Sequence, residues 1–211
     1  MPKKGIEPIR REQLIQATFQ VIHDIGLADA TVATIARQAG LSAGIVAHYF
    51  GDKAGLLNAA MRQILNELKD AFAHYRAQAD ANPRAQLRAL VDGNFDQTQT
   101  SGPAMRVWLT FWAASMHQPE LARLQRINDQ RLYSNLAHQF HRALPAARAR
   151  NAARGLAAMI DGLWLRGSLV GAPFDTAAAR ALAYAYIDFQ LQPEGVQAAS
   201  RPSPLVPRSA P

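Results

Sequence analysis

Apolar side chains recur at intervals of three and four residues along most of the chain, which is the spacing of one face of an α-helix. The first such segment contains Leu14, Ala17, Val21 and Ile25. Gly26 follows directly, and glycine tolerates the left-handed backbone in which many helices end. The pattern therefore predicts a first helix that ends at Gly26.

Polar residues that cap helix N-termini divide the next stretch. Thr31 can cap a short helix through Ala39, which Gly40 breaks. Ser42 can cap a second short helix through about Tyr49, and Asp52 can cap a long helix after it. The first third of the chain is therefore predicted to hold four helices.

Proline marks the interruptions in the rest of the helical pattern, and it is common in the first turn of a helix. The interruptions lie at Asn82-Pro83, Ser101-Gly102-Pro103, Gln118-Pro119, Leu144-Pro145 and Gly171-Ala172-Pro173. No stretch alternates with period two for long enough to form a strand. We expect an all-α fold with about nine helices in total.

Composition changes at the end of the chain. From residue 193 to residue 211, prolines lie among Gly, Ser and Ala with few large apolar residues, which predicts a disordered tail. Within it, Leu205-Val206-Pro207-Arg208 resembles a thrombin-cleavage sequence, so the tail is either natural or left by a tag.

The overall composition excludes several classes of protein. The chain has 211 residues, of which 49% are hydrophobic and 18% charged, as expected for a soluble globular protein. Without cysteine it has no disulfide, thiol nucleophile or cysteine-bound metal, which fits a reducing compartment. The longest stretch without Asp, Glu, Lys or Arg is 14 residues, and about 18 are needed to cross a bilayer. We expect a cytoplasmic protein with no membrane partner.

Net charge points only weakly to an anionic partner. The chain carries a formal charge of +7. Residues 1–53 contribute six Lys and Arg against five Asp and Glu, a difference of +1. Bulk charge therefore does not locate a binding face.

The strongest functional signal lies between Thr31 and Lys53, where the sequence reads TVATIARQAGLSAGIVAHYFGDK. Two helices of about eight residues joined by a glycine turn have the proportions of a helix-turn-helix, whose second helix enters the major groove of DNA. Ile35 and Val46 are apolar where the two helices must share a core. The outward positions of the second helix are Ser42, Ala43, Gly44, Ala47 and His48.

These outward residues suit a DNA groove. Small side chains allow close approach, Ala can touch a thymine methyl group, and His48 can bind a base edge or a phosphate. A purely structural helix pair would have the same spacing. Lys53 favours DNA, because a cation in the first turn of a helix opposes the helix dipole unless a phosphate also docks there.

The motif resembles a known family. The pattern comprises Gly26, Thr31, Ile35-Ala36, Ala39-Gly40-Leu41-Ser42, Gly44, His48-Tyr49-Phe50, Asp52-Lys53 and Leu56-Leu57. It resembles the DNA-binding domain of TetR-family repressors. The resemblance implies a three-helix DNA-binding domain over residues 1–53, and an effector-binding and dimerisation domain over residues 54–192.

The same resemblance implies two groups of DNA contacts. The residues expected at the bases are Ser42, Ala43, Gly44 and His48. The residues expected at phosphates are Thr31, Tyr49 and Lys53. Ala47 stands where many family members carry an aromatic residue, so one phosphate contact is in question. The basic residues Lys3, Lys4, Arg10 and Arg11 either form an arm that reaches DNA or are solvated surface charges.

Three further segments resemble the choline-responsive repressors of this family, and the likeness spans about residues 1–192. The segments are Gly93-Asn94-Phe95-Asp96, Trp108-Leu109 with Phe111-Trp112-Ala113, and Ile160-Asp161-Gly162-Leu163-Trp164. The resemblance implies a homodimer on a pseudo-palindromic operator of genes for glycine betaine synthesis. It implies release by choline or its aldehyde, with no cofactor. A related repressor with another cationic or apolar effector is the alternative.

Aromatic residues in the larger part suit such an effector. Trp108 and Trp112 share one helical face, and with Phe95 and Trp164 they could surround a quaternary ammonium ion. A helix-spaced aromatic stripe is also typical of an ordinary core. The candidate carboxylates are Asp96 and Asp161, although Asp161 could instead pair with an arginine such as Arg166.

The last two predicted helices, residues 149–171 and 175–191, are rich in Ala and Gly, which suits a four-helix dimer interface. The apolar residues available for its seam are Leu156, Ile160, Leu163, Ala181, Tyr184 and Ile187.

Two other classes of protein compete with a repressor. An enzyme lacks support, because no glycine-rich phosphate loop, nucleophile elbow or zinc-helix motif is present. The pair His138 and His141 could bind a metal but is more typical of a solvated surface. An all-α interaction module would leave the helix-turn-helix features unexplained.

Overall fold

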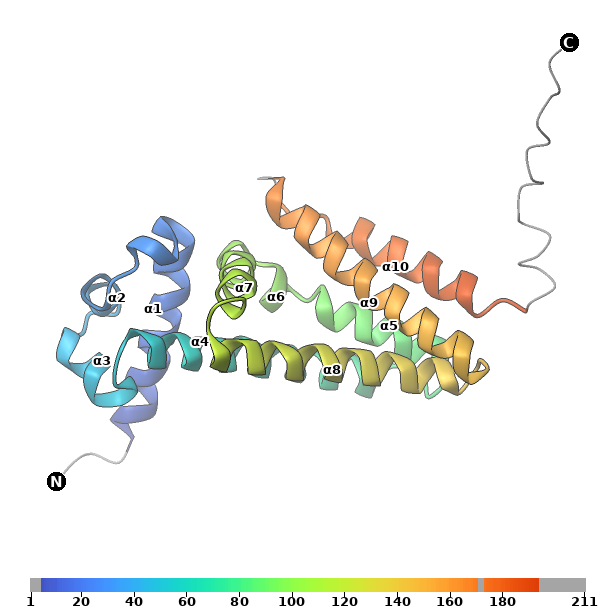
Figure 1. Ribbon diagram of the computed structural model, residues 1–211, viewed down its shortest axis with the longest axis horizontal. Coiled ribbons are helices and arrows are strands. Elements are labelled where there is room, and N and C mark those ends of the chain that lie inside the picture. The colour runs from blue at the N-terminus through green and yellow to red at the C-terminus, as the bar shows by residue number, and fades with distance from the viewer. Residues whose placement is uncertain (1–4, 171–172, 194–211) are drawn as a thin grey trace, which may run out of the picture.

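The computed structural model describes residues 5–170 and 173–193 (Figure 1). Its helices are α1 (Ile6–Asp29), α2 (Val32–Gln38), α3 (Ala43–Phe50), α4 (Lys53–Gln78), α5 (Pro83–Asn94), α6 (Gln97–Thr100), α7 (Gly102–Ser115), α8 (Pro119–His141), α9 (Ala146–Leu169) and α10 (Thr176–Gln190). The described ranges contain no strand, so the all-α prediction is confirmed. One helix more than expected is present, and α6 is a single turn of four residues.

The first helix does not end where the sequence predicted. Gly26 adopts a positive φ of 78°, as expected, but the chain kinks there and remains helical to Asp29. The Lys53 ammonium donates a hydrogen bond to the Leu27 carbonyl oxygen at 3.0 Å, just after the kink. This contact gives one of the final carbonyls of α1 a partner, which helical geometry alone would leave open.

The predicted caps form at most of the short helices. The Thr31 and Thr34 side chains make a reciprocal capping box at the start of α2. The Asp52 carboxylate accepts from the Gly55 backbone N–H at 2.7 Å at the start of α4. Ser42 occupies the N-cap position of α3 but makes no capping hydrogen bond, so its exposed hydroxyl is not used within α3.

One long helix joins the two parts of the molecule. In Figure 1, α1, α2 and α3 gather around the N-terminal end of α4, and the rest of α4 runs into the larger bundle beside α5 and α8. A helix of 26 residues spans about 39 Å at 1.5 Å per residue. Helix α7 lies between the parts and packs on both α1 and α8.

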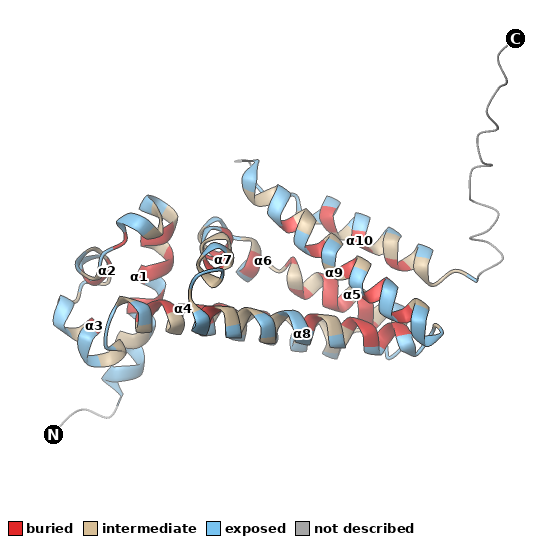
Figure 2. Ribbon diagram, viewed as in Figure 1, coloured by how far each residue is buried: buried red, intermediate tan, exposed pale blue. Residues whose placement is uncertain are grey.

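Buried residues, coloured red, lie in both parts of the molecule (Figure 2). Ile35 and Val46 are fully buried between α2 and α3, as the sequence predicted. Phe111 and Phe140 are among the largest fully buried side chains of the larger part. The two cores belong to one continuous cluster of buried apolar residues.

The predicted dimer seam is partly wrong. Leu156, Ile160 and Ile187 are buried inside the single chain, because α9 and α10 turn these faces toward α8 and α5. The outward faces of the two helices carry other apolar residues. Leu169 is 69% exposed on α9, and Leu182 is 56% exposed on α10.

Two sequence predictions fall outside the described residues. Lys3 and Lys4 of the basic arm are not described, and neither is the tail beyond Pro193. Within the described ranges, no helix is long and apolar enough to cross a membrane.

Candidate functional site

The predicted base-reading residues share the solvent face of α3. Ser42, Ala43, Gly44, Ala47 and His48 are all exposed, while the intervening Val46 is fully buried. Four of the five side chains are small, so the surface that they form is shallow. The helix can therefore present this face to a partner without losing its own core contacts.

The predicted phosphate-binding residues flank this face. Thr31 is exposed at the start of α2, and Tyr49 is half-buried at the end of α3, where its ring lies 4.9 Å from that of His48 between centroids. Lys53 is half-buried, and its ammonium already binds the Leu27 carbonyl oxygen. That contact offers a structural reason for a cation in the first turn of α4, so phosphate binding by Lys53 stays a prediction.

Arg11 holds the C-terminal end of α3. Its guanidinium donates to the Tyr49 carbonyl oxygen at 2.8 Å and lies 4.8 Å from the centroid of the Phe50 ring. Terminal carbonyls of a helix lack helical donors, and a cation there is favoured by the helix dipole. The sequence placed Arg11 in a possible DNA arm. No local pattern indicates its contact with a residue 38 positions away.

The three tryptophans meet in the larger part. Helix α7 supplies Trp108 and Trp112, and α9 supplies Trp164. The Trp112 and Trp164 rings lie 5.1 Å apart between centroids, and Trp108 lies 6.4 Å from Trp112 and 6.5 Å from Trp164. The Trp108 indole N–H donates to Oε1 of the buried Gln99 at 3.1 Å. Trp108 and Trp164 are buried and Trp112 is half-buried.

Two carboxylates line the same cavity as these rings. Asp161 comes from α9 and Asp129 from α8, and the cavity has a volume of about 40 Å³. Within the described part of the chain neither carboxylate has a cationic partner, so the suggested pair of Asp161 with Arg166 does not form. Both residues are exposed to solvent.

The electrostatics of this carboxylate pair favour a cation. Partial burial raises the pKa of Asp161 to about 6, and the nearby negative charge of Asp129 adds to the effect. Partial burial also raises the pKa of Asp129, against the opposing hydrogen bond from Gln125. Two unpaired acids beside aromatic faces are costly when both are ionised, and a bound cation would relieve the repulsion.

Sequence reasoning missed Asp129, Gln125 and Gln99. Gln125 and Asp129 are four residues apart on one face of α8, and this spacing could have indicated a shared role. Their proximity to the tryptophans comes only from the packing of α8 against α7 and α9.

The structure does not bring Phe95 and Asp96 to this cavity. Phe95 is buried against Phe174, with ring centroids 5.7 Å apart. Asp96 caps α6 by accepting from the Thr98 backbone N–H at 2.8 Å, and it accepts from the Tyr75 hydroxyl at 3.0 Å. Burial alone would raise the pKa of Asp96, but these hydrogen bonds hold it below its usual value. Both residues line a separate cavity of about 660 Å³.

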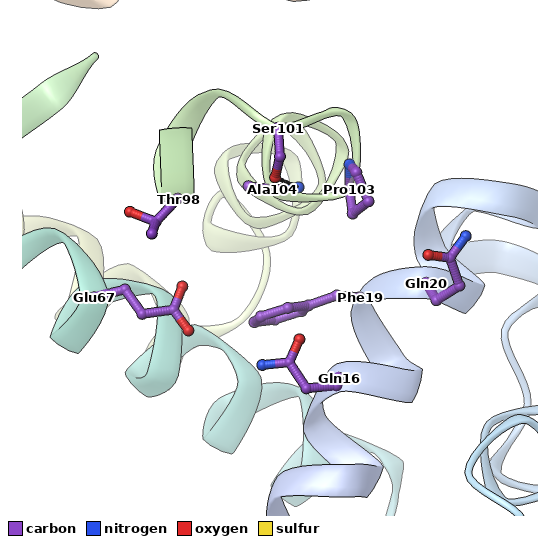
Figure 3. Close-up of a pocket in the computed structure, with 8 residues that line it drawn as sticks. All are labelled: Gln16, Phe19, Gln20, Glu67, Thr98, Ser101, Pro103 and Ala104. Atoms are coloured by element: carbon purple, nitrogen blue, oxygen red, sulfur yellow. Dashed lines mark hydrogen bonds between the residues drawn. The ribbon is translucent and has the colours of Figure 1, made fainter. Parts of the chain in front are cut away.

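A third cavity lies where the two parts meet (Figure 3). It has a volume of about 300 Å³ between α1, α4, α6 and α7. Figure 3 shows Phe19 pointing from α1 toward Glu67 of α4, beside Pro103 and Ala104 at the start of α7. Burial raises the pKa of Glu67. The start of the tryptophan-bearing helix thus contacts the helix that carries Arg11.

In the described part of the chain, no group of three or more His, Asp or Glu residues lies close enough to hold an ion. His138 and His141 are both exposed on α8, as expected for a solvated pair.

Two family models match the chain, one over the part that contains α2 and α3 and the other over the larger part. Residues 14–60 match the family of bacterial regulatory proteins of the tetR type, and residues 83–192 match the BetI-type transcriptional repressor C-terminal family. The chain belongs to the TetR family. It is a DNA-binding transcriptional repressor with a BetI-type C-terminal region, and it is not an enzyme.

Curated relatives of this TetR-family repressor cover most of its length. It is 77% identical over 192 residues to the HTH-type transcriptional regulator BetI of Stenotrophomonas maltophilia, covering 91% of this chain and 98% of the relative. It is 62% identical over 189 residues to the HTH-type transcriptional regulator BetI 2 of Chromohalobacter salexigens, covering 89% and 91%.

Solved structures share the fold at lower identity. A TetR transcription regulator from Haloarcula marismortui is 24% identical with a TM-score of 0.77, covering 88% of this chain and all of that one (100%). A transcriptional regulator from Saccharomonospora viridis, solved in complex with choline, is 21% identical with a TM-score of 0.71, covering 86% and 96%.

Proposed function

We propose that this repressor senses choline, or its aldehyde, and controls genes of the pathway from choline to glycine betaine. The observation that carries the proposal is the cavity at which three tryptophans meet two carboxylates without cationic partners. Aromatic faces and carboxylates attract a trimethylammonium group through the ring quadrupole and the opposite charge. The relatives named BetI and the choline complex of the Saccharomonospora regulator support this choice.

The size of the cavity implies a conformational step. A volume of about 40 Å³ is little more than the roughly 30 Å³ that one water molecule occupies in the liquid. Choline has seven non-hydrogen atoms and needs more space. A ligand that binds only a widened arrangement of α7, α8 and α9 shifts the chain toward that arrangement.

Two helices can carry this change to the DNA end. Helix α7 bears Trp112 near its end, and its first turn lines the 300 Å³ cavity of Figure 3 together with Phe19 of α1. Helix α4 lines the effector cavity with Leu68 and begins with Lys53 beside α1. On this proposal residues 1–53 bind DNA, and residues 54–192 bind the effector and dimerise.

A homodimer completes the proposal. The exposed apolar residues Leu165, Leu169 and Leu182 on α9 and α10 would be covered by a second copy. A two-fold dimer carries two copies of α3 and would read a pseudo-palindromic operator. In each half-site Ser42, Ala43, Gly44 and His48 would face bases. Thr31, Tyr49 and Lys53 would bind phosphates.

Displacement of labelled promoter DNA tests the effector. We expect choline to release the DNA, tetramethylammonium to release it less well, and the neutral isostere 3,3-dimethylbutanol to have no effect. Calorimetric titration of choline into free and operator-bound protein should show weaker binding in the complex, because coupling between two sites is reciprocal. Equal choline affinity in the two titrations would rule out choline as the inducer and leave a repressor with a different effector.

A further inference from the structure

Gln125 carries an unused hydrogen-bond acceptor beside the tryptophan cavity. The residue lies on α8 and lines the cavity. Its amide nitrogen donates to Asp129 Oδ1 at 2.8 Å. Its Oε1 is shielded from solvent and, within the described ranges, receives no hydrogen bond. A buried acceptor without a donor costs free energy, so a ligand that supplies a donor gains by meeting it.

The charge of Asp129 fixes the orientation of this amide. Rotating the amide by 180° would place Oε1 against the Asp129 carboxylate, where two acceptors repel each other. The amide NH₂ group therefore faces Asp129 and the oxygen faces away from it. As long as Asp129 is ionised, Gln125 offers the ligand an acceptor and no donor.

The neighbouring polar groups do not satisfy this oxygen. The Trp108 indole N–H is occupied by Gln99, and the Asn94 amide donates to the Leu90 carbonyl oxygen at 2.9 Å. Ionised Asp129 and Asp161 can only accept. The cavity therefore lacks a cation beside its two carboxylates and a hydrogen-bond donor for Gln125 Oε1. A trimethylammonium alcohol supplies both within a single small molecule.

We propose that Gln125 recognises the hydroxyl group of the effector, so that the site selects a quaternary ammonium alcohol over compounds without a hydroxyl donor. This inference rests on the proposed choline response. The cation lies against the tryptophans and carboxylates, and the hydroxyl donates to Gln125 Oε1. A carbonyl or ether oxygen at the same position presents an acceptor to an acceptor and binds more weakly.

Calorimetric titration of the full chain with choline, choline methyl ether and tetramethylammonium tests this role. For the unaltered protein we expect choline to bind about tenfold more tightly than the ether, the ratio typical of one well-placed hydrogen bond. In Gln125→Met, which keeps a similar shape without the amide, the ratio should fall to about one. Tetramethylammonium affinity should change by less than about twofold, because the variant keeps the rings and carboxylates.

Gln130→Met is the matched control, because Gln130 is exposed on the same helix and lies outside the cavity lining. It should keep the tenfold ratio, and melting curves should show that both variants fold. A ratio that persists in Gln125→Met would reflect the bulk of the methyl group and overturn the inference. Equal binding of choline and ether by the unaltered protein would also overturn it. Failure of all three compounds to bind would instead overturn the proposed effector class.

Discussion

The outward face of α3, proposed to bind DNA, and the tryptophan cavity, proposed to bind the effector, differ in how far their functional side chains are buried. On α3, the outward residues are exposed and all but His48 are small, and partly buried contacts such as the hydrogen bond from Arg11 to the Tyr49 carbonyl oxygen hold the helix from its other side. In the tryptophan cavity, Trp108 and Trp164 are themselves buried in the bundle, while Asp129 and Asp161 are exposed and have no cationic partner within the described residues.

This contrast concerns which of the two regions has to change conformation when it binds its partner. The DNA-facing surface can be presented with little change, because its side chains serve no internal packing. On the proposed function, the tryptophan cavity would admit a ligand only if α7, α8 or α9 moved, because two of its three rings, Trp108 and Trp164, are also part of the core. On the proposed function, the coupling between the two sites would begin in the tryptophan cavity, and the following predictions test this.

The largest effect is expected from Trp112→Ala. Loss of a cation–π contact in a desolvated site costs about 2 kcal/mol, so choline should bind about 30-fold more weakly and fail to release DNA. Operator binding should stay nearly normal, because Trp112 packs against Trp108 and Trp164 in the larger part. Trp112→Phe keeps an aromatic face and should retain part of the response. Parallel loss of operator binding in Trp112→Ala would show that the two regions are not separable.

Removing the contact of Arg11 with the end of α3 should weaken operator binding, although no outward side chain of α3 is changed. Arg11→Met deletes the hydrogen bond to Tyr49, and hydrogen bonds to charged groups are worth about 1.5–3 kcal/mol. We expect operator affinity to fall at least tenfold while the salt dependence on random DNA stays unchanged, as measured by fluorescence anisotropy. A reduced salt slope would instead place Arg11 on a phosphate.

Choline affinity should depend on pH through Asp161, whose pKa is raised to about 6. A cation favours the ionised carboxylate, so affinity should be full above pH 7 and fall as the pH drops through 6, by up to about tenfold per unit. Without ligand, the stability of the folded chain depends on pH in the opposite direction. The folded state then holds the proton more tightly than the unfolded chain, so this group adds stability at low pH and the contribution is lost as the pH rises through 6. Calorimetry on Asp161→Asn should give weak binding with a flat pH profile.

Two substitutions separate the roles at the DNA-facing end. His48→Ala should relax sequence preference, because the exposed imidazole faces the bases on this proposal. Lys53→Ala should weaken binding to all DNA and lower the salt slope by about one unit. If Lys53 serves only the Leu27 carbonyl, the melting temperature will fall while the salt slope stays the same.

The smallest effect is expected from removing residues 193–211. That segment has too few large apolar residues to offset the entropy of ordering it. The anchor just before it is kept, since Arg148 donates to the Gln190 and Gln192 carbonyl oxygens. Circular dichroism and size-exclusion chromatography should show unchanged folding and assembly, and a large drop in melting temperature would disprove the prediction.

The sequence alone was enough for the all-α fold, the helix-turn-helix and its outward residues. Capping hydrogen bonds such as those of Thr31 and Asp52 link residues three positions apart, and helix geometry fixes which side of α3 is buried once Val46 is in the core. Interactions of this range are written in contiguous residues, so periodicity and caps suffice to predict them.

Only the tertiary structure decided the composition of the effector cavity. It joined Asp129 and Gln125 of α8 to the tryptophans of α7 and α9, and it moved Phe95 and Asp96 to a different cavity. It also gave Lys53 and Arg11 partners 26 and 38 residues away along the chain. These contacts depend on how whole helices pack, which is set by the summed shape of many core side chains rather than by any local pattern.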